Sequence, residues 1–330
     1  MYESNRKYKS VLFLIKLLIT IGLCAVILWK VDWRGTWNAL QHTNLLILIV
    51  VFAGMILNVF ISTLKWKILL SIHLIRFELS QLYKYYFTAS FFNNFLPSTI
   101  GGDGYRIYKT FRNPTSKAGA VTSVLVERIT GILALMFIGF IGGIVSYLQT
   151  GNEVSRIVVV MGLFVSGILI PVALVLIFSV SPLQRLIRKY LPSKIIKILE
   201  QFGNYRSNLS KTFIVVLLSL FFQFFLLCYR FLLIYAVGAS VSIFDLAVVV
   251  AVSTIIALAP ISLNGIGLLD GSFIYLLVGF GVSYEHAFIV MLLIRALSFL
   301  LSFVGGVFYF LDRKSLKVDT NKLQEIQTSQ

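Results

Sequence analysis

Charged residues are scarce in this chain. Lysine, arginine, aspartate and glutamate make up 13% of its 330 residues, whereas a soluble globular domain carries about 25%. Hydrophobic residues make up 58%, and apolar runs recur along the whole length, each of roughly the twenty residues that a helix needs to cross a bilayer. No stretch is long and polar enough for a separate soluble domain. The sequence therefore predicts an all-α polytopic membrane protein with one integral membrane domain, residues 1–330.

Cysteine, histidine and catalytic motifs are also scarce. Cys24 and Cys228 lie inside apolar runs, where we expect packed core side chains, and the histidines show no metal-ligand spacing. The chain has no nucleotide-binding loop, nucleophile elbow or metalloprotease helix. These absences predict no metal, no cofactor, no catalytic residue and no ATP-driven work by this chain alone. The first apolar run is too long for the core of a cleavable signal peptide.

Basic residues are concentrated in a few segments. The 29 lysines and arginines outnumber the 13 acids and give a net charge of +16. Because they cluster in loops, the positive-inside rule explains most of this excess and attraction to anionic headgroups the rest, so no nucleic-acid partner is expected. The basic segments are the N-terminal ten residues, 65–84, 102–118, 181–211 and the tail 312–330. They predict a multi-pass protein of the cell (inner, cytoplasmic) membrane with both termini in the cytoplasm.

Six apolar runs are long enough to be full spans. They lie near 11–29, 44–64, 119–147, 156–180, 212–237 and 285–311. Two further apolar segments, 85–101 and 244–281, are interrupted. Because the loops on both sides of 85–101 are basic, that segment should enter and leave from the cytoplasm as a re-entrant helical hairpin, and 244–281 should be re-entrant from the outside. The alternative is eight plain spans, which would place the basic loop 102–118 outside.

The two interruptions have the same composition. FFNNFLPSTIGGDGYR (91–106) and TIIALAPISLNGIGLLDG (254–271) are each apolar up to a proline, followed by glycines and an aspartate. Non-helical backbone at membrane depth is tolerated only where it is buried or lines a wet cavity, and such breaks in two halves are typical of transporter binding sites. We expect an inverted repeat, with halves at 1–150 and 151–311 and a substrate site between them.

Charged residues within apolar runs mark a functional site by default. The interval from Asp103 to Arg128 is 25 residues, as is that from Asp270 to Arg295. These could be structural pairs that hold each hairpin to the next span. Alternatively, the arginines could bind an anionic headgroup, because a guanidinium donates two parallel hydrogen bonds to phosphate. The acids could be counter-ions, which is the favoured role, or proton carriers.

Small and polar residues at the breaks complete the candidate site. Asn93 and Asn94 could satisfy backbone groups freed by the break or contact the substrate, and glycines let the backbone approach an anion closely. The candidate substrate-binding residues are Asn93, Asn94, Pro97, Gly101, Gly102, Asp103, Arg106, Glu127, Arg128, Arg230, Pro260, Asn264, Gly265, Gly267, Asp270 and Arg295. Separately, segment 181–211 has apolar residues at helical spacing between basic ones, which predicts an amphipathic helix in the cytoplasmic interface that binds anionic lipid.

The two broken segments and the Glu127-Arg128 pair together resemble one family. It is the flippase-like integral membrane family related to the transmembrane region of lysylphosphatidylglycerol synthases, and the resemblance extends from the first span through Arg295. Its first motif, N-x-x-L-P followed by GGD and an arginine, corresponds to Asn93, Leu96, Pro97, Gly101, Gly102, Asp103 and Arg106. In the second motif, Leu263-Asn264 stands where a proline-glycine is common, and Asp270 where a glutamate is common.

The resemblance implies a lipid flippase or transporter that moves an anionic phospholipid or a polyisoprenyl-linked glycolipid across the cytoplasmic membrane. It does not imply synthesis. Bifunctional relatives carry a large soluble aminoacyl-transfer domain after the membrane region, and this chain ends shortly after its last span, so we expect no enzyme activity. The alternative is a non-transporting scaffold that holds a glycosyltransferase or lipid-modifying enzyme at the membrane, with 102–118 and 181–211 as its docking surface.

Overall fold

The structure is a computed structural model that describes residues 2–95, 101–111, 117–160, 162, 193–259 and 261–328. Within these ranges every regular element is helical, as expected for a chain that must pair its own backbone groups inside a bilayer. The elements are α1 (Tyr2–Trp29), α2 (Trp33–Gln41), α3 (Leu45–Ile72), α4 (Leu79–Phe95), α5 (Gly101–Thr110), α6 (Lys117–Thr150), α9 (Ser193–Gln201), α10 (Gly203–Arg206), α11 (Leu209–Ala236), α12 (Ile243–Ala257), the 3-10 turn η2 (Leu263–Gly265), α13 (Leu268–Gly279) and α14 (Tyr284–Thr328). The all-α membrane fold is confirmed.

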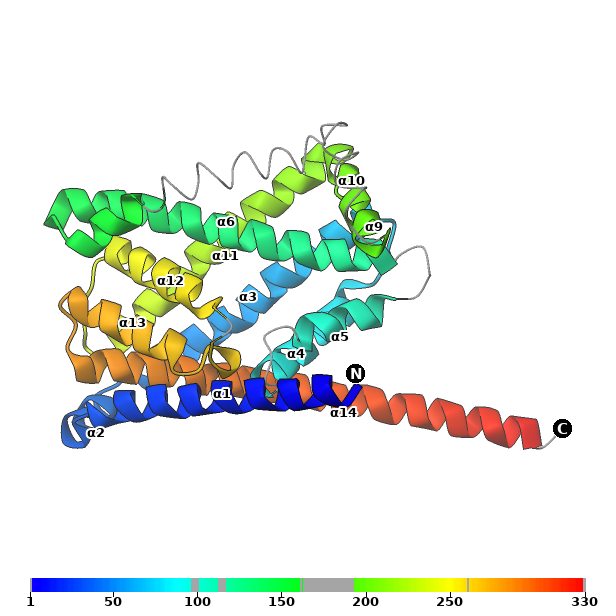
Figure 1. The fold of residues 1–330 in the computed structure, drawn as a ribbon, viewed down its shortest axis with the longest axis horizontal. Helices are drawn as coiled ribbons and strands as arrows, with labels where there is room; N and C mark the ends of the chain where they lie inside the picture. Colours follow the sequence, from blue (N-terminus) through cyan, green and yellow to red (C-terminus); the bar gives the residue numbers. More distant parts are fainter. Residues whose placement is uncertain are drawn as a thin grey trace.

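Long apolar helices form the frame of the molecule. α3, α6, α11 and the Tyr284–Leu311 part of α14 are each long and apolar enough to cross a membrane. The apolar part of α1, Phe13–Trp29, is followed by α2 after a bend of 80°, so α2 turns away from α1 at one end of the molecule (Figure 1). Asp32 begins α2 by accepting a hydrogen bond from the Arg34 amide, as a helix N-cap does.

Five of the six predicted spans coincide with α1, α3, α6, α11 and α14. The sixth, 156–180, is described only at 156–160 and 162, where it is helical; its remainder lies outside the described residues. The basic segment 65–84 is not a loop throughout, because α3 continues to Ile72. The tail continues α14 as a helix through residue 328.

Each interrupted segment forms two short helices that pack against each other. These are α4 with α5, and α12 with α13. α5 has 10 residues and α13 has 12, too few for either helix to cross by itself a hydrocarbon core that needs about twenty. α4 and α5 lie toward the end of the molecule that holds α9 and α10, and α12 and α13 lie toward the opposite end (Figure 1). The two helical hairpins therefore approach the centre from opposite ends.

Each hairpin packs against the last span of the other predicted half. α4 lies along α14, and α12 lies along α6. Glycines permit these contacts, because a Cβ at Gly305 would lie 2.0 Å from the carbonyl oxygen of Phe87 and one at Gly139 would lie 2.4 Å from the Cβ of Ala251. Small residues matter here because lipid is as apolar as a core side chain, so close packing rather than the hydrophobic effect holds helices together.

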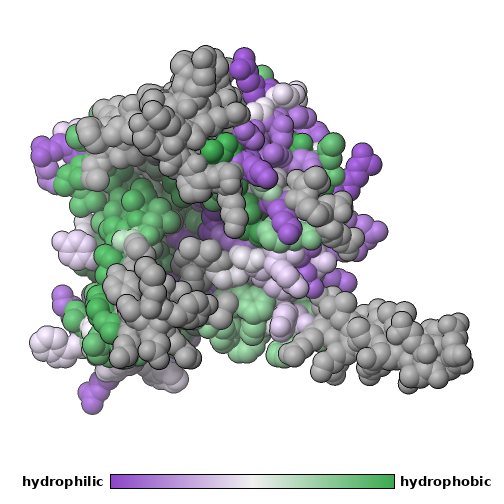
Figure 2. Space-filling view, turned by 45° about the vertical axis from the view of Figure 1, so that its right-hand side comes forward, coloured by the Kyte–Doolittle hydropathy of each residue, from purple (hydrophilic) through white to green (hydrophobic). Residues whose placement is uncertain are grey.

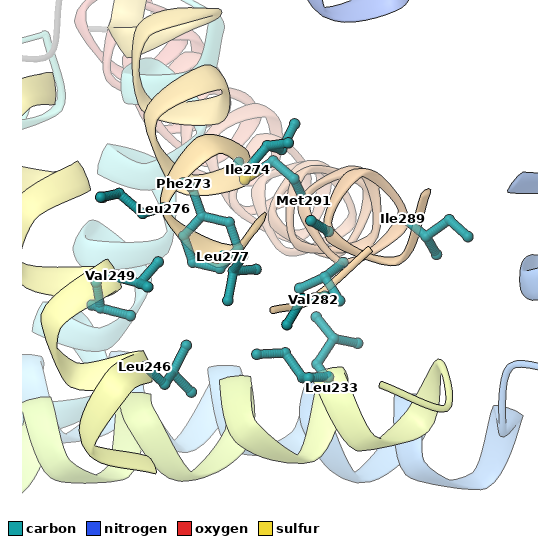
Figure 3. Packing of buried hydrophobic residues seen from close by; sticks show 14 of the residues in the cluster. Leu233, Leu246, Val249, Phe273, Ile274, Leu276, Leu277, Val282, Ile289 and Met291 are labelled. Carbon is teal, nitrogen blue, oxygen red and sulfur yellow. The ribbon is translucent and has the colours of Figure 1, made fainter. Parts of the chain in front are cut away.

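A large cluster of buried side chains surrounds the second hairpin. It joins α11, α12, α13 and α14, and Figure 3 shows Leu233, Leu246 and Leu277 converging from three of these helices. Leu246, Leu277 and Ile289 have no exposed surface. The hairpin is thus held on several sides by tightly packed neighbours.

The surface separates into apolar and polar regions. Large apolar side chains such as Leu18, which is 68% exposed, cover the outer faces of the long helices. Figure 2 shows a hydrophobic area on one side of the molecule and hydrophilic residues gathered at the upper right. An apolar surface of this extent on helices of spanning length is a lipid-facing surface.

The segment predicted as one amphipathic helix, 181–211, is divided in its described part. α9 packs on α6, and α10 packs on α11. Tyr205 of α10 is buried among residues of α3, α6 and α11. Residues 181–192 lie outside the described residues.

Candidate functional site

The first hairpin closes through a hydrogen bond between its two arms. The Gly102 amide donates a hydrogen bond of 2.9 Å to Oδ1 of Asn93. A Cβ at Gly102 would lie 2.2 Å from the carbonyl oxygen of Ala89, so only glycine allows α5 to approach α4 this closely. Asn93 therefore satisfies a backbone group next to the break, one of its two predicted roles.

Asn94 fastens the same hairpin to α14. Its side-chain amide donates to the carbonyl oxygen of Ser298 at 3.3 Å and to the hydroxyl of Ser302. Both asparagines thus have structural partners in the protein, and neither is held out toward a ligand.

A cluster of charges joins the first hairpin to α6. Nε of Arg128 donates to Oδ2 of Asp103 at 2.9 Å. Arg106 forms an ion pair with Glu127, and the hydroxyl of Tyr86 donates to the other carboxylate oxygen of Glu127 at 2.9 Å. The side chain of Arg128 is 52% exposed, whereas that of Arg106 is 3% exposed. Arg128 can therefore reach a ligand, and Arg106 is part of the protein interior.

Aromatic rings complete the surroundings of Arg106. Its guanidinium carbon lies 4.3 Å from the ring centre of Trp66 and 4.4 Å from that of Tyr86. Cation–π contacts of this kind stabilise a desolvated guanidinium. The basic segment 102–118 is thus not a simple solvated loop, because helix α5 turns Arg106 inward.

The second hairpin turns through left-handed backbone. Asn264, Gly265 and Gly267 have φ values of 51°, 71° and 80°. Asparagine tolerates this region better than other side chains, which explains how Asn264 can stand where a glycine is common. The Leu263 amide, next to this turn, donates to the hydroxyl of Thr20 at 2.9 Å, so α1 contacts the break.

Asp270 binds both the turn of the second hairpin and Arg295. Its Oδ2 accepts a hydrogen bond of 2.8 Å from the Gly267 amide at the start of α13. Nε and Nη2 of Arg295 donate to its two carboxylate oxygens at 2.8 and 3.0 Å. Arg295 also donates to the carbonyl oxygen of Gly265 at 3.5 Å. Both pairs predicted from the 25-residue interval therefore form, each between a hairpin and the following span.

The two arginines lie at matching positions along their helices. Arg128 is 11 residues into α6 and Arg295 is 11 residues into α14. At 1.5 Å per residue this is roughly 16 Å along each helix from its first residue. The two ion pairs therefore occupy equivalent places along α6 and α14.

A model of one protein family, described as the lysylphosphatidylglycerol synthase TM region, matches residues 13–306. The chain belongs to this family. The matched residues include both hairpins and both arginine-bearing spans, which confirms the resemblance drawn from the two motifs. Searches of the curated proteins and of the solved structures gave no match.

The two predicted halves of this family member differ in one respect. Three residues after Asp103 stands Arg106, whereas three residues after Asp270 stands Phe273. The residue before Arg128 is Glu127, whereas the residue before Arg295 is Ile294. The second half thus lacks the buried Arg–Glu pair of the first and has apolar side chains in its place.

Arg230 has the aromatic ring of Phe273 as its neighbour. It projects from α11, and its guanidinium carbon lies 5.8 Å from the ring centre of Phe273. In the first half, Arg106 of the hairpin contacts the ring of Trp66 on α3. In the second half the roles are exchanged, because the hairpin supplies the ring of Phe273 and α11 supplies the cation, Arg230. Among the described residues, no carboxylate lies within salt-bridge distance of Arg230, and its Nε is buried without a hydrogen-bond partner.

Lys65 is a charged residue that the sequence placed in a basic cytoplasmic segment. The structure places it inside α3, where it is 3% exposed. Its ammonium lies 5.3 Å from the ring centre of Phe222 on α11. The signal that could have found it is the apolar run after it, residues 68–72, which carries the helix a further turn and a half.

A cavity of about 180 Å³ borders the second ion pair. Apolar side chains of α1, α13 and α14 form its walls, and Asp270 and Arg295 lie at its margin. An apolar cavity with an arginine at its edge has the two chemical parts that a lipid requires, since acyl carbons favour the walls and a phosphate favours the guanidinium.

The predicted site residues thus form two groups. The first contains Gly101 and Gly102 at the start of α5 with Asp103, Arg106, Glu127 and Arg128; the second contains Asn264, Gly265, Gly267, Asp270 and Arg295. Arg230 lies outside both groups and contacts the ring of Phe273 on α13. Pro97 and Pro260 lie outside the described residues. Within the described part of the chain, no three metal-ligating side chains come together.

Proposed function

We propose that this protein moves a lipid with an anionic headgroup, either a phospholipid or a polyisoprenyl-linked glycolipid, between the leaflets of the cytoplasmic membrane. The observation that carries the proposal is the pair of Asp–Arg contacts, which join hairpins from opposite ends to matching positions along α6 and α14. Membrane transporters place their sites where broken helices from two inverted repeats meet. In this proposal both termini face the cytoplasm, as the basic segments favour.

The arginines are the groups that contact the headgroup phosphate. Arg128 uses Nε for its bond to Asp103, and 52% of its side chain is exposed, so its terminal nitrogens can reach a lipid phosphate. Arg295 borders the apolar cavity. The aspartates hold each guanidinium in place while the site is empty, which reduces the penalty of an embedded charge.

Lipid movement in reconstituted vesicles tests the proposal. A fluorescent phosphatidylglycerol in the inner leaflet becomes open to a membrane-impermeant reducing agent only after it crosses. We expect rapid loss of fluorescence with the wild type and at least tenfold slower loss with Arg128→Ala and with Arg295→Ala. Arg156→Ala is the matched control, because Arg156 pairs with Glu153 at the surface, where both side chains are more than half exposed. Unchanged movement in both site variants would remove the arginines from the mechanism.

The same vesicles distinguish lipid transport from the scaffold alternative. If the protein only holds an enzyme at the membrane, vesicles of the wild type show no lipid movement, and substitution of the surface lysines Lys117 and Lys197 weakens binding of the partner enzyme. Lipid movement that survives these substitutions favours transport. The proposal includes no synthetic step, and product analysis of the same vesicles by mass spectrometry should find every lipid chemically unchanged.

A further inference from the structure

Three of the four tryptophans of the chain lie close together, at the end of α1 and along α2. Trp29, Trp33 and Trp37 are 88%, 61% and 60% exposed, whereas Trp66 has no exposed surface. Single exposed apolar side chains are ordinary, but neighbouring large rings on one surface mark a contact with a membrane or a protein. These three residues, the tryptophan cluster, therefore need a partner outside the chain.

Helix α2 lies across the end of α1. Its 9 residues extend about 13 Å, which is too short to cross a bilayer. It follows the apolar part of α1 after a bend of 80°, so when α1 crosses the membrane, α2 runs nearly parallel to the membrane plane. Trp33 and Trp37 are four residues apart and lie on the same face of α2. The two rings therefore share one face of a helix that follows the membrane surface.

Contacts within the protein fix the position of α2. It packs on α14, where the ring of Trp33 lies edge to face with that of Phe288, at 6.4 Å between ring centres. The hydroxyl of Tyr284 donates to the carbonyl oxygen of Ile27 at 2.7 Å, which holds the end of α1 at the same part of α14. The protein thus holds α2 in place while leaving Trp37 and most of Trp33 exposed.

The surroundings of the tryptophan cluster change from apolar to charged. The helices that enter and leave this region expose large apolar side chains, Leu28 on α1 and Leu45 and Leu46 on α3, so the cluster continues the lipid-facing surface. Beside the rings in the chain stand the exposed basic residues Lys30 and Arg34. Tryptophan favours such a boundary, because its ring is apolar and its N–H can donate to headgroup oxygens. These neighbours favour a lipid surface over a protein as the partner.

We propose that α2 is an interfacial helix that lies in the headgroup layer of the outer leaflet, with the tryptophan cluster in contact with lipid. The leaflet follows from Figure 1, in which α2 and the pair α9–α10 lie at opposite ends of the long helices, because the basic segment of α9 and α10 favours the cytoplasm. There, α2 fixes the depth of the end of α1, where Ile27 and Leu28 line the cavity beside Arg295. This placement of α2 does not depend on whether the protein transports a lipid.

Tryptophan fluorescence of the full-length protein in phosphatidylcholine vesicles measures the depth of the rings. A nitroxide quencher is carried by the lipid, either on the headgroup or near the methyl end of an acyl chain, and iodide is the quencher in water. The triple variant Trp29→Phe, Trp33→Phe and Trp37→Phe retains only Trp66 and gives the background to subtract. The three single variants, each of which keeps an aromatic ring, give the share of each tryptophan even if the triple variant does not fold.

We expect the headgroup nitroxide to quench the difference signal about twofold more than the methyl-end nitroxide does. Stronger quenching by the methyl-end nitroxide would place the rings in the hydrocarbon, and quenching by iodide alone would place them in water. Quenching by none of the three would mean that a protein, such as a second copy of this chain, covers them. Each of these three outcomes overturns the proposal.

Cysteine labelling in intact cells that produce the protein tests the leaflet. In a background of Cys24→Ser and Cys228→Ser, one cysteine is added at an exposed position, either Asn38 of α2 or Lys197 of α9. A membrane-impermeant maleimide should label Asn38→Cys in intact cells and Lys197→Cys only after the cells are opened. The background without an added cysteine is the blank, and the reverse labelling pattern would place α2 on the cytoplasmic side and overturn the proposal.

Discussion

Both carboxylate oxygens of Asp270 accept hydrogen bonds from Arg295, at 2.8 Å from Nε and 3.0 Å from Nη2. The same carboxylate accepts the Gly267 amide at the start of α13. One side chain therefore joins the turn of the second hairpin to the middle of α14. In the first hairpin, Asp103 holds Arg128 through Nε alone and also faces Arg106 at 3.6 Å.

Removing the acid of the second pair should destabilise the protein. Asp270→Asn leaves the guanidinium of Arg295, whose side chain is 21% exposed, without a counter-charge. We expect a loss of about 3 kcal/mol in the free energy of unfolding, measured by denaturant titration in detergent. Glu153→Gln breaks an exposed pair and should change it by about 0.5 kcal/mol or less. The double variant Asp270→Asn with Arg295→Met should recover most of the loss; a loss as large as the single variant's would mean that the pair is not the cause.

The close approach of the first hairpin's arms predicts a strong effect of one added methyl group. Gly102→Ala would place a Cβ 2.2 Å from the carbonyl oxygen of Ala89, so α4 and α5 must separate. We expect a loss of about 1–3 kcal/mol. At Gly104, two residues along the same helix, an added Cβ meets nothing within 4 Å. Gly104→Ala should therefore leave the unfolding midpoint unchanged or raise it, and equal losses at the two positions would contradict this account of the hairpin.

The contact between α4 and α14 makes a separate prediction. A Cβ at Gly305 would lie 2.0 Å from the carbonyl oxygen of Phe87. Gly305→Ala should push α4 away from α14 and increase hydrogen–deuterium exchange along α4, because loosened helices exchange faster. Gly131→Ala is the control, since its Cβ meets nothing within 4 Å. Exchange in α4 that stays at the wild-type rate would show that this contact does not hold the hairpin.

The hydroxyl of Tyr86 should contribute measurably to the first charge cluster. Tyr86→Phe leaves Oε1 of the buried Glu127 without this donor, which costs about 1–3 kcal/mol. Tyr83→Phe removes a longer bond, 3.4 Å to the Ile56 carbonyl, and should cost about 0.5 kcal/mol or less. The comparison is made by denaturant titration, and a ranking in the reverse order would place Glu127 in a wetter environment than the structure does.

His73, which follows the end of α3, predicts a pH dependence. Burial lowers its pKa below the ordinary value, and a hydrogen bond with Gln201 opposes this to a smaller extent. The unfolded chain therefore binds a proton more readily than the folded protein, so the free energy of unfolding should fall as the pH drops below about 6.5. Unfolding midpoints between pH 5 and 8 should show a steeper acid loss for the wild type than for His73→Gln. Parallel profiles would exclude His73 as the cause.

Local signals predicted the hairpins and their ion pairs well. The breaks near Gly101 and Gly265 follow from prolines and glycines in apolar runs, and the two acids and two arginines stand at equal intervals along the chain. The partners of Arg106 were not predictable in this way. They come from α3, α4 and α6, and only the packing of α5 brings that guanidinium between Trp66 and Tyr86.

The sequence by itself determined the membrane fold and the places where helices break, because hydropathy and backbone preference are properties of the chain. Its two 25-residue intervals offered the pairing of Asp103 with Arg128 and of Asp270 with Arg295 as one of two alternatives, and the folded structure forms both pairs. Only the tertiary structure decided which cations are left without an acid. Lys65 is basic and lies near the end of an apolar run, and a lysine at the cytoplasmic end of a membrane helix has the same place in a sequence. Its burial depends on which face of α3 packs against α11, and the energy of a buried charge depends on what surrounds it in space.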